Sequence, residues 1–402
     1  MTKDEIEAWA KDPRRADTLP FGLYEPRYQK GITGAALVVR GVIYFRNGFT
    51  PEVRNVLVRC FEQYNAAIEE YTRALDAATG KPPSKTGPLR WFYAEGQQPT
   101  AYEKSPGFES LARSVPADQT LAVSMTSAEH KLAAGFYEFT VFALSDWKAE
   151  RKRGLDGLAF SVPRAFLVQR PDVFQALFAA FAEALPTVSG HAGLAVNLPP
   201  MGREPNEAGE YFYARRFGPG IDVGDPMRSN VRKLFTKIKT VDWLNALDGE
   251  MVREVGGASS LTLPPDWFIC RPMDNGGLLI QAGKEPDSGV SVGPGRPPAP
   301  PAAYVLLNHA LRPIVADTLD TLQDGTLDST APVLNTVIAT EGWLRKFNVP
   351  EDQINAYWVE LHKTPKVTDG KAAIVQRIMK LRERLGLPAR PSSEPDGNGP
   401  AA

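Results

Sequence analysis

The stretch from residue 211 to residue 283 constrains the fold of this chain more than any other segment. Turn signals, a short amphipathic helix predicted within residues 238–257 and two strand runs follow one another there with almost no intervening filler. Asn275, Gly276 and Gly277 mark a hairpin turn between the strand runs at 267–272 and 278–281. This dense succession of short elements predicts the centre of a compact domain that mixes helices with strands.

The residues around this centre supply further strands and a long helix. From Val53 to Leu75 apolar residues recur at steps of three and four, behind Thr50 as a cap and Pro51 in the first turn, until Gly80 ends the helix. Strand runs occur at 35–45, 89–93, 121–125, 136–144 and 193–198, and a second helix is predicted at 171–185. Because strands and helices do not alternate strictly, the predicted class is α+β, with mostly antiparallel sheet packed with several helices in a single large domain or two closely packed subdomains.

Composition excludes several classes of function. A chain of 402 residues with 43% apolar and 23% charged residues can bury a substantial core. Its net charge of −1 gives no overall attraction to nucleic acid or to an anionic membrane surface. No apolar run approaches the ~18 residues of a membrane span, and the first residues contain no apolar leader. We therefore expect a cytoplasmic protein that binds neither nucleic acid nor membrane directly.

The sequence contains no recognisable catalytic or metal-binding motif. Its histidines are His130, His191, His309 and His362, and none has the spacing of a zinc site. There is also no phosphate-binding glycine loop and no evident nucleophile with its base. We therefore predict no enzyme, no cofactor and no metal. The alternative that stays open is a hydrolase in which His191 works with Asp222 or Asp225, two carboxylates in the glycine-rich loop at 218–226.

One charge pattern is less ordinary. Residues 313–344 contain no lysine or arginine, while aspartates recur at steps of three and four, at Asp317, Asp320, Asp324 and Asp328. Like charges at this spacing would destabilise a helix slightly. The simple interpretation is a solvated acidic face or loop. The functional hypothesis is an acidic surface that attracts a basic partner. These four aspartates, with Asp222 and Asp225, are the candidate partner-binding residues, and the loops at 218–226 and 286–301 are expected to be exposed.

The C-terminal part is predicted to be helical. Helices are expected at 304–311, 333–347, 351–362 and 371–385, followed by a Pro/Ser/Gly-rich tail from residue 389 that is expected to be disordered. This organisation suggests three parts: a main domain at 1–347, a helical pair at 348–388 and the tail at 389–402. A further alternative is a scaffold that self-associates through the C-terminal helices.

Several motifs resemble those of a known family. They are GHAGLAVNLP at 190–199, ARRFGPGIDVGDP at 214–226, IKTVDWLNAL at 238–247, GGLLIQAGKEPDSG at 276–289 and EGWLRKF at 341–347. Together they resemble the TsiV-like family of type VI secretion immunity proteins, over roughly residues 35–347. The resemblance implies a non-enzymatic protein that binds and neutralises a cognate secreted toxin, a nuclease of the VRR-NUC type. It supplies no catalytic residues, and it leaves residues 348–388 as an appended helical pair.

Overall fold

A computed structural model describes residues 17–22, 29–80, 82, 87–293, 296–325, 334–367 and 371–388 of the chain. Asp328 and the predicted tail at 389–402 lie outside these residues.

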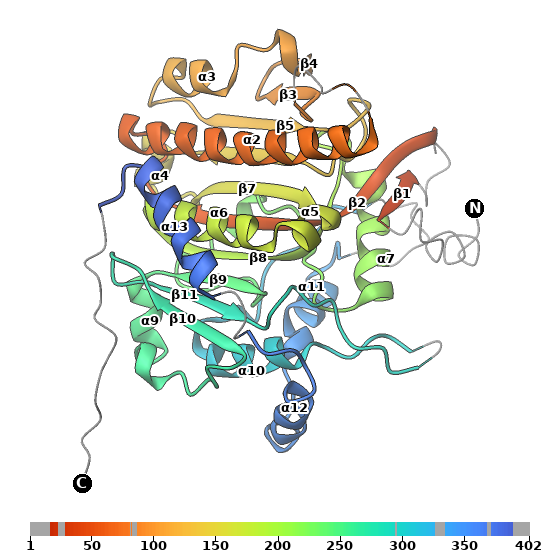
Figure 1. Cartoon of the computed structure of the whole chain (residues 1–402), viewed down its shortest axis with the longest axis vertical. Helices are drawn as coiled ribbons and strands as arrows, with labels where there is room; N and C mark the ends of the chain where they lie inside the picture. The colour runs from red at the N-terminus through yellow and green to blue at the C-terminus, as the bar shows by residue number, and fades with distance from the viewer. Residues whose placement is uncertain are drawn as a thin grey trace.

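One sheet forms the centre of the molecule, and its ladders are all antiparallel (Figure 1). The strand order is β10-β11-β9-β8-β2-β7-β6-β5-β3-β4, and β1 pairs with the first part of β2. The strands are Thr18–Phe21 (β1), Gln29–Phe45 (β2), Trp91–Ala94 (β3), Thr100–Ala101 (β4), Leu121–Thr126 (β5), Glu138–Ala143 (β6), Asp156–Pro163 (β7), Thr187–Asn197 (β8), Leu244–Leu247 (β9), Phe268–Pro272 (β10) and Leu278–Ala282 (β11). The predicted α+β class with mostly antiparallel sheet is confirmed.

Helix α2 (Pro51–Thr79) begins and ends where the sequence predicts. Thr50 caps its first turn, and Gly80 ends it in the left-handed conformation, with a φ of 68° that glycine adopts without steric cost. Its apolar stripe lies on the sheet: Tyr64 packs against Phe160 of β7, with ring centroids 6.1 Å apart. The stripe is therefore part of the core.

The remaining helices cover the two faces of the sheet. They are Phe108–Ser114 (α3), Asp146–Glu150 (α4), Arg164–Gln169 (α5), Pro171–Ala184 (α6), Glu207–Phe217 (α7), Ser229–Arg232 (α8), Gly249–Glu254 (α9), Ala302–Ala310 (α10), Val337–Leu344 (α11), Ile354–Leu361 (α12) and Lys371–Arg384 (α13). Figure 1 shows α2, α6 and α13 in front of the sheet, and both α2 and α13 contact α6. Helix α7 packs against β2 and β8, and α10 against β11.

One expectation needs correction here. The short helix predicted within residues 238–257 is confined to Gly249–Glu254 (α9), because Leu244–Leu247 is the strand β9. All four residues of β9 are buried between β8 and β11, and the Asp248 carboxylate then caps α9 at 2.8 Å from the amide of Met251. Tertiary pairing thus overrides the helical pattern at this point.

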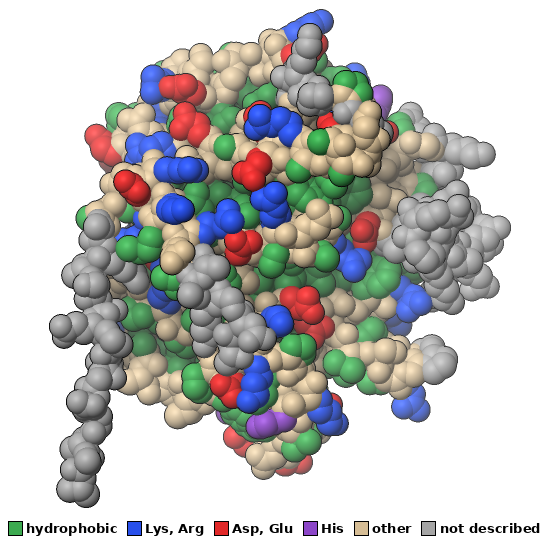
Figure 2. Space-filling model, viewed as in Figure 1, with side chains coloured by type: hydrophobic (Ala, Val, Ile, Leu, Met, Phe, Trp, Pro, Cys, Tyr) green, Lys and Arg blue, Asp and Glu red, His purple; other side chains and the backbone are tan. Residues whose placement is uncertain are grey.

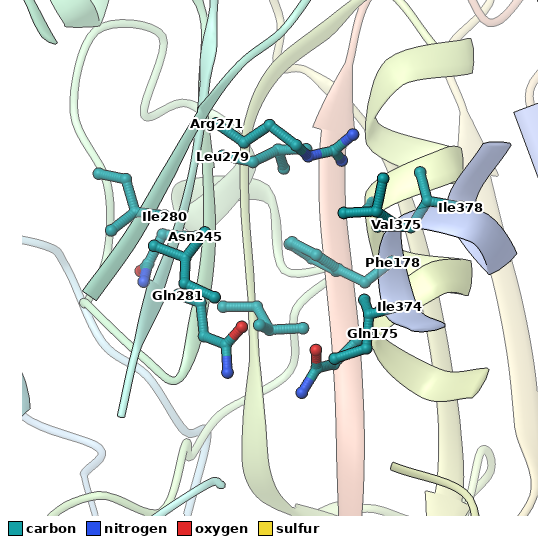
Figure 3. A pocket seen from close by; sticks show the side chains of 13 residues that line it. Gln175, Phe178, Asn245, Arg271, Leu279, Ile280, Gln281, Ile374, Val375 and Ile378 are labelled. Atoms are coloured by element: carbon teal, nitrogen blue, oxygen red, sulfur yellow. The ribbon is translucent and has the colours of Figure 1, made fainter. Parts of the chain in front are cut away.

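Helix α13 uses its predicted apolar stripe within the chain. Ile374 and Ile378 face Phe178 of α6 across an apolar pocket of about 130 Å³ (Figure 3). The Arg382 guanidinium, itself buried, pairs with Glu183 of α6. A surface already committed to α6 is not open for self-association, so this arrangement does not favour the scaffold alternative.

Candidate functional site

The sheet face beneath α7 is polar, although it is largely covered. Alternation along the strands and the ladder register place on this face the side chains of Arg40, Ser124, Glu138, Thr140, Ser161, His191, Asn197 and Asn245. A covered sheet face ordinarily carries apolar side chains, since each buried polar group needs a partner. This polar face is therefore the candidate functional site.

Asp222 lies at the centre of this face and contacts three cationic or ionisable groups. Its Oδ2 atom is 3.1 Å from Arg40 Nη2 and 3.2 Å from His191 Nε2, and its Oδ1 atom is 2.5 Å from Lys239 Nζ. All four side chains are buried. Burial alone would raise the pKa of Asp222, but Lys239, His191 and Arg40 together hold this pKa well below its usual range. Burial lowers the pKa of His191 despite the carboxylate beside it.

The loop at 218–226 is buried along β8, which corrects the expectation that it would be exposed. The amide of Asp222 donates to the carbonyl of Leu194 at 2.7 Å, and the amide of Gly220 donates to the carbonyl of Ser288 at 2.7 Å. A Cβ atom at Gly220 would lie 2.0 Å from the Asp287 carbonyl oxygen, so only glycine permits this approach. The same composition that is typical of exposed turns here allows two backbone segments to pack closely.

The structure brings together only part of the predicted catalytic set. His191 contacts Asp222, as the enzymatic alternative requires, but both side chains are buried and Lys239 and Arg40 also hold the carboxylate. Asp225 lies apart, one third exposed, with its Oδ2 atom 3.8 Å from Arg203 Nε. A general base must reach a proton of its substrate. In this structure His191 and Asp222 are therefore part of a buried ion-pair cluster.

Asp225 lies at the edge of a small polar pocket beside this cluster. The pocket has a volume of about 130 Å³ and is also lined by Arg40, Glu138, Arg203 and Asn197. Burial raises the pKa of Glu138, although Arg203 opposes this shift. Unlike Asp222, Asp225 is accessible to a partner.

A second cluster of ionisable groups, Asp242 and Lys346, lies next to the Asp222 cluster. The sequence alone did not predict it. Gly193 on β8 leaves space for the buried Asp242, because a Cβ atom there would come within 1.8 Å of Asp242 Oδ1. Burial and the nearby Asp222 raise the pKa of Asp242 to about 8. Burial lowers the pKa of Lys346 to about 8, and its ammonium lies 4.7 Å from the centre of the Trp343 ring. The motif WLRKF, with a lysine between aromatic residues, was the one available signal.

Two buried glutamates of α7 fix the position of the acidic segment at 317–325. The Glu207 carboxylate accepts from the amides of Asp324 and Gly325. The Glu210 carboxylate accepts from the amide of Gly224 at 2.8 Å and from the side chain of Gln323. Burial raises the pKa of Glu207 to about 7 and also raises that of Glu210. These contacts hold the segment in one conformation.

The acidic segment at 317–325 forms no regular helix, and most of its aspartates are exposed. Asp317 and Asp324 are exposed and pair with arginines from elsewhere, Asp317 with Arg312 and Asp324 with Arg228 at 2.8 Å. Asp320 is exposed as well. Asp328 lies outside the described residues. The absence of basic residues in the local sequence is thus partly offset in three dimensions.

Within the described ranges, no group of three or more His, Cys, Asp or Glu side chains is arranged to hold a metal ion. No helix in this part of the chain has the length and apolar character needed to cross a bilayer.

Comparison with known proteins first places this fold in a class. The structure is similar to that of a type VI secretion system (T6SS) protein of Pseudomonas aeruginosa, with a TM-score of 0.79 and 28% identity over 92% of this chain and 98% of the other. No curated protein matches the sequence. The fold is therefore that of a protein associated with type VI secretion.

The family follows from the sequence. The family model for TsiV, described as type VI immunity for VRR-NUC, matches residues 56–347. The chain belongs to this family, and its function is type VI immunity. The match contains Asp222, His191 and Lys239 of the cluster, α7 and the acidic segment, whereas Arg40 precedes it and α12 and α13 lie beyond it. The resemblance described from the motifs is confirmed.

Proposed function

We propose that this chain protects the cell by binding a VRR-NUC effector in the cytoplasm and blocking it without chemical turnover. The observation that carries the proposal is the family match across residues 56–347, which includes every strand of the polar face from β5 to β9 except β2. The buried ion-pair cluster around Asp222 supports a binding role, since its charged groups pair with one another inside the chain. The effector itself is the partner, and no contact with nucleic acid or membrane is required.

The surface that we propose for the effector combines exposed charge with exposed apolar side chains. The amide of Leu322 donates to Thr340 Oγ1 at 3.1 Å, which places the acidic segment beside α11. On α11, Ile338 is 85% exposed and Val337 about half exposed. Apolar anchors inside a polar rim are typical of protein interfaces with strong binding. Negative charge there would complement the basic surface that a nuclease presents to its nucleic acid.

The electrostatic part of this proposal is tested by association kinetics. We expect Asp320→Asn/Asp324→Asn to slow association with a VRR-NUC effector by roughly three- to tenfold at low salt, with the difference vanishing at high salt. The matched control Glu103→Gln/Asp118→Asn removes two exposed charges elsewhere and should associate like the wild type. Ile338→Asp should instead speed dissociation, because it removes an apolar contact. An unchanged association rate for the first variant would eliminate the acidic segment from the interface.

Neutralisation is tested in cells. Co-expression of the chain with the nuclease domain of the effector should restore growth, and the two proteins should co-purify. The enzymatic alternative predicts that His191→Gln abolishes protection while the complex still forms. Our proposal predicts that protection and complex formation are lost or kept together in every variant. A variant that binds the effector tightly but fails to protect would show that binding alone is not the mechanism.

A further inference from the structure

A second surface feature lies on the opposite face of the sheet, where α2, α6 and α13 meet. A groove of about 140 Å³ runs between these helices. Its floor is apolar and includes Phe166, Val173, Leu177 and Leu381. One wall of the groove is formed by the stretch of α2 from Gln63 to Tyr71, whose length at 1.5 Å per residue is about 12 Å.

The α13 rim of this groove is basic. Arg377, Lys380 and Arg384 lie along it, and Arg170 lines the groove at the start of α6. Arg170 pairs with Glu70 at 2.9 Å, and Arg377 pairs with Asp172 at 2.7 Å. Lys380 and Arg384 are exposed on α13 and have no carboxylate partner among the described residues. Figure 2 shows Lys and Arg side chains gathered over this part of the face. The groove therefore has an excess of positive charge.

A buried donor faces the same groove. Tyr71 lines it and is only 2% exposed, and its hydroxyl has no hydrogen-bond partner among the described residues. Burial raises the pKa of Tyr71, although the nearby Arg170 opposes the shift, so the hydroxyl keeps its proton and can donate it. A buried hydroxyl without an acceptor costs free energy, and an incoming carboxylate oxygen would remove this cost.

We infer that this groove receives an acidic peptide segment that carries an apolar side chain, contributed by a protein partner. Lys380, Arg384 and Tyr71 provide the cations and the donor for its carboxylates, and the floor accepts the apolar side chain. A free fatty acid brings one carboxylate only, whereas two cations, Lys380 and Arg384, lie along the α13 rim. A segment of about four extended residues, at ~3.3 Å each, matches the length of the groove.

This inference rests on the proposed function when it names the effector as the partner. Helix α13 contributes one rim and lies beyond the matched residues 56–347. The groove would thus add contacts to those made by the acidic segment, on a different set of helices. Its test must separate the chemistry of the groove from the identity of the partner.

The first experiment uses the full chain and defined probes. We expect acetyl-ELEE-amide to bind saturably, with a dissociation constant of about 0.1–1 mM by NMR titration. Acetyl-QLQQ-amide should not saturate, and laurate should not compete with the acidic peptide. Lys380→Glu/Arg384→Glu should weaken binding at least about tenfold. Lys104→Glu/Lys131→Glu, two exposed cations elsewhere, should not change it. Tyr71→Phe should weaken it several-fold without loss of stability, since it removes an unpaired buried hydroxyl.

The results of these experiments distinguish failure of the groove inference from failure of the proposed function. If the wild-type chain does not bind the acidic peptide, or binds laurate in its place, the inference is overturned whatever the effector does. If the peptide binds but Lys380→Glu/Arg384→Glu leaves effector binding unchanged, the groove does not serve the effector, while the proposed function stands. If the wild-type chain does not bind the effector at all, the proposed function fails, and the peptide titration alone decides whether the groove recognises acidic segments.

Discussion

Replacing Asp222 by asparagine tests whether the buried cluster stabilises the fold. The substitution preserves the shape of the side chain and leaves the backbone hydrogen bond to Leu194 in place. It also leaves Arg40 and Lys239 buried without a counter-charge, at 5% and 3% exposure. Removing one partner of a buried ion pair costs about 3–5 kcal/mol, because the remaining charges are desolvated and unpaired. This is a large part of a typical stability of about 5–15 kcal/mol.

The assay is urea unfolding followed by circular dichroism. With a slope of about 3 kcal/mol per molar urea, we expect the midpoint to fall by about 1 M or more. Asp225→Asn is the control, since Asp225 is one third exposed and its carboxylate makes only a long ion pair, 3.8 Å, with Arg203. This variant should shift the midpoint by less than about 0.3 M. Lys239→Met should recover part of the loss in the Asp222→Asn background, because it removes one unpaired cation.

The pH dependence has a definite sign. The pKa of Asp222 is depressed in the folded chain, so its stabilising contribution is present above the ordinary value of 3.8 and is lost as the pH falls through the folded value. The difference between wild type and Asp222→Asn should therefore shrink in acid. If the variant unfolds within about 0.3 M urea of the wild type at neutral pH, the cluster does not stabilise the fold and this reasoning is wrong.

Three further predictions concern neighbouring features. Gly193→Ala should destabilise the chain by about 1–3 kcal/mol in urea, because its Cβ would collide with Asp242 Oδ1, and Asp242→Ala should relieve the loss. The pKa of Asp242 is raised to about 8, so the contribution of Asp242 to the free energy of unfolding should fall as the pH rises from about 4 to 8, by up to ~1.4 kcal/mol per pH unit. Asp242→Asn should remove this slope. Equal slopes for the wild type and the variant would contradict the raised pKa. Arg382→Met should speed hydrogen exchange in α13 but not in α2, because Arg382 joins α13 to Glu183 and Asp274. If the amides of α13 are equally protected in the wild type and the variant, packing alone holds α13.

The sequence predicts elements whose signals are local and misses contacts that depend on distant residues. Helix α2 was predicted because Thr50, the apolar stripe and Gly80 are adjacent in the chain. Strand β9 was missed because four apolar residues contain no period that separates a strand from a helix. The burial of Asp222 could not be predicted, since Arg40, its partner, lies 182 positions away. The composition of its loop is equally typical of an exposed turn.

The position of β2 in the sheet has a consequence for how the chain is made. This strand leaves the ribosome early, but both of its long neighbours come much later: β7 ends at Pro163 and β8 at Asn197. At about 5–20 residues per second, roughly 6–24 s separate the synthesis of Phe45 from that of Pro163. During that interval the longest strand of the sheet lacks both of its long neighbours. Nascent chains should therefore depend on chaperones, and an immunity protein that is needed before its toxin arrives must be synthesised well in advance.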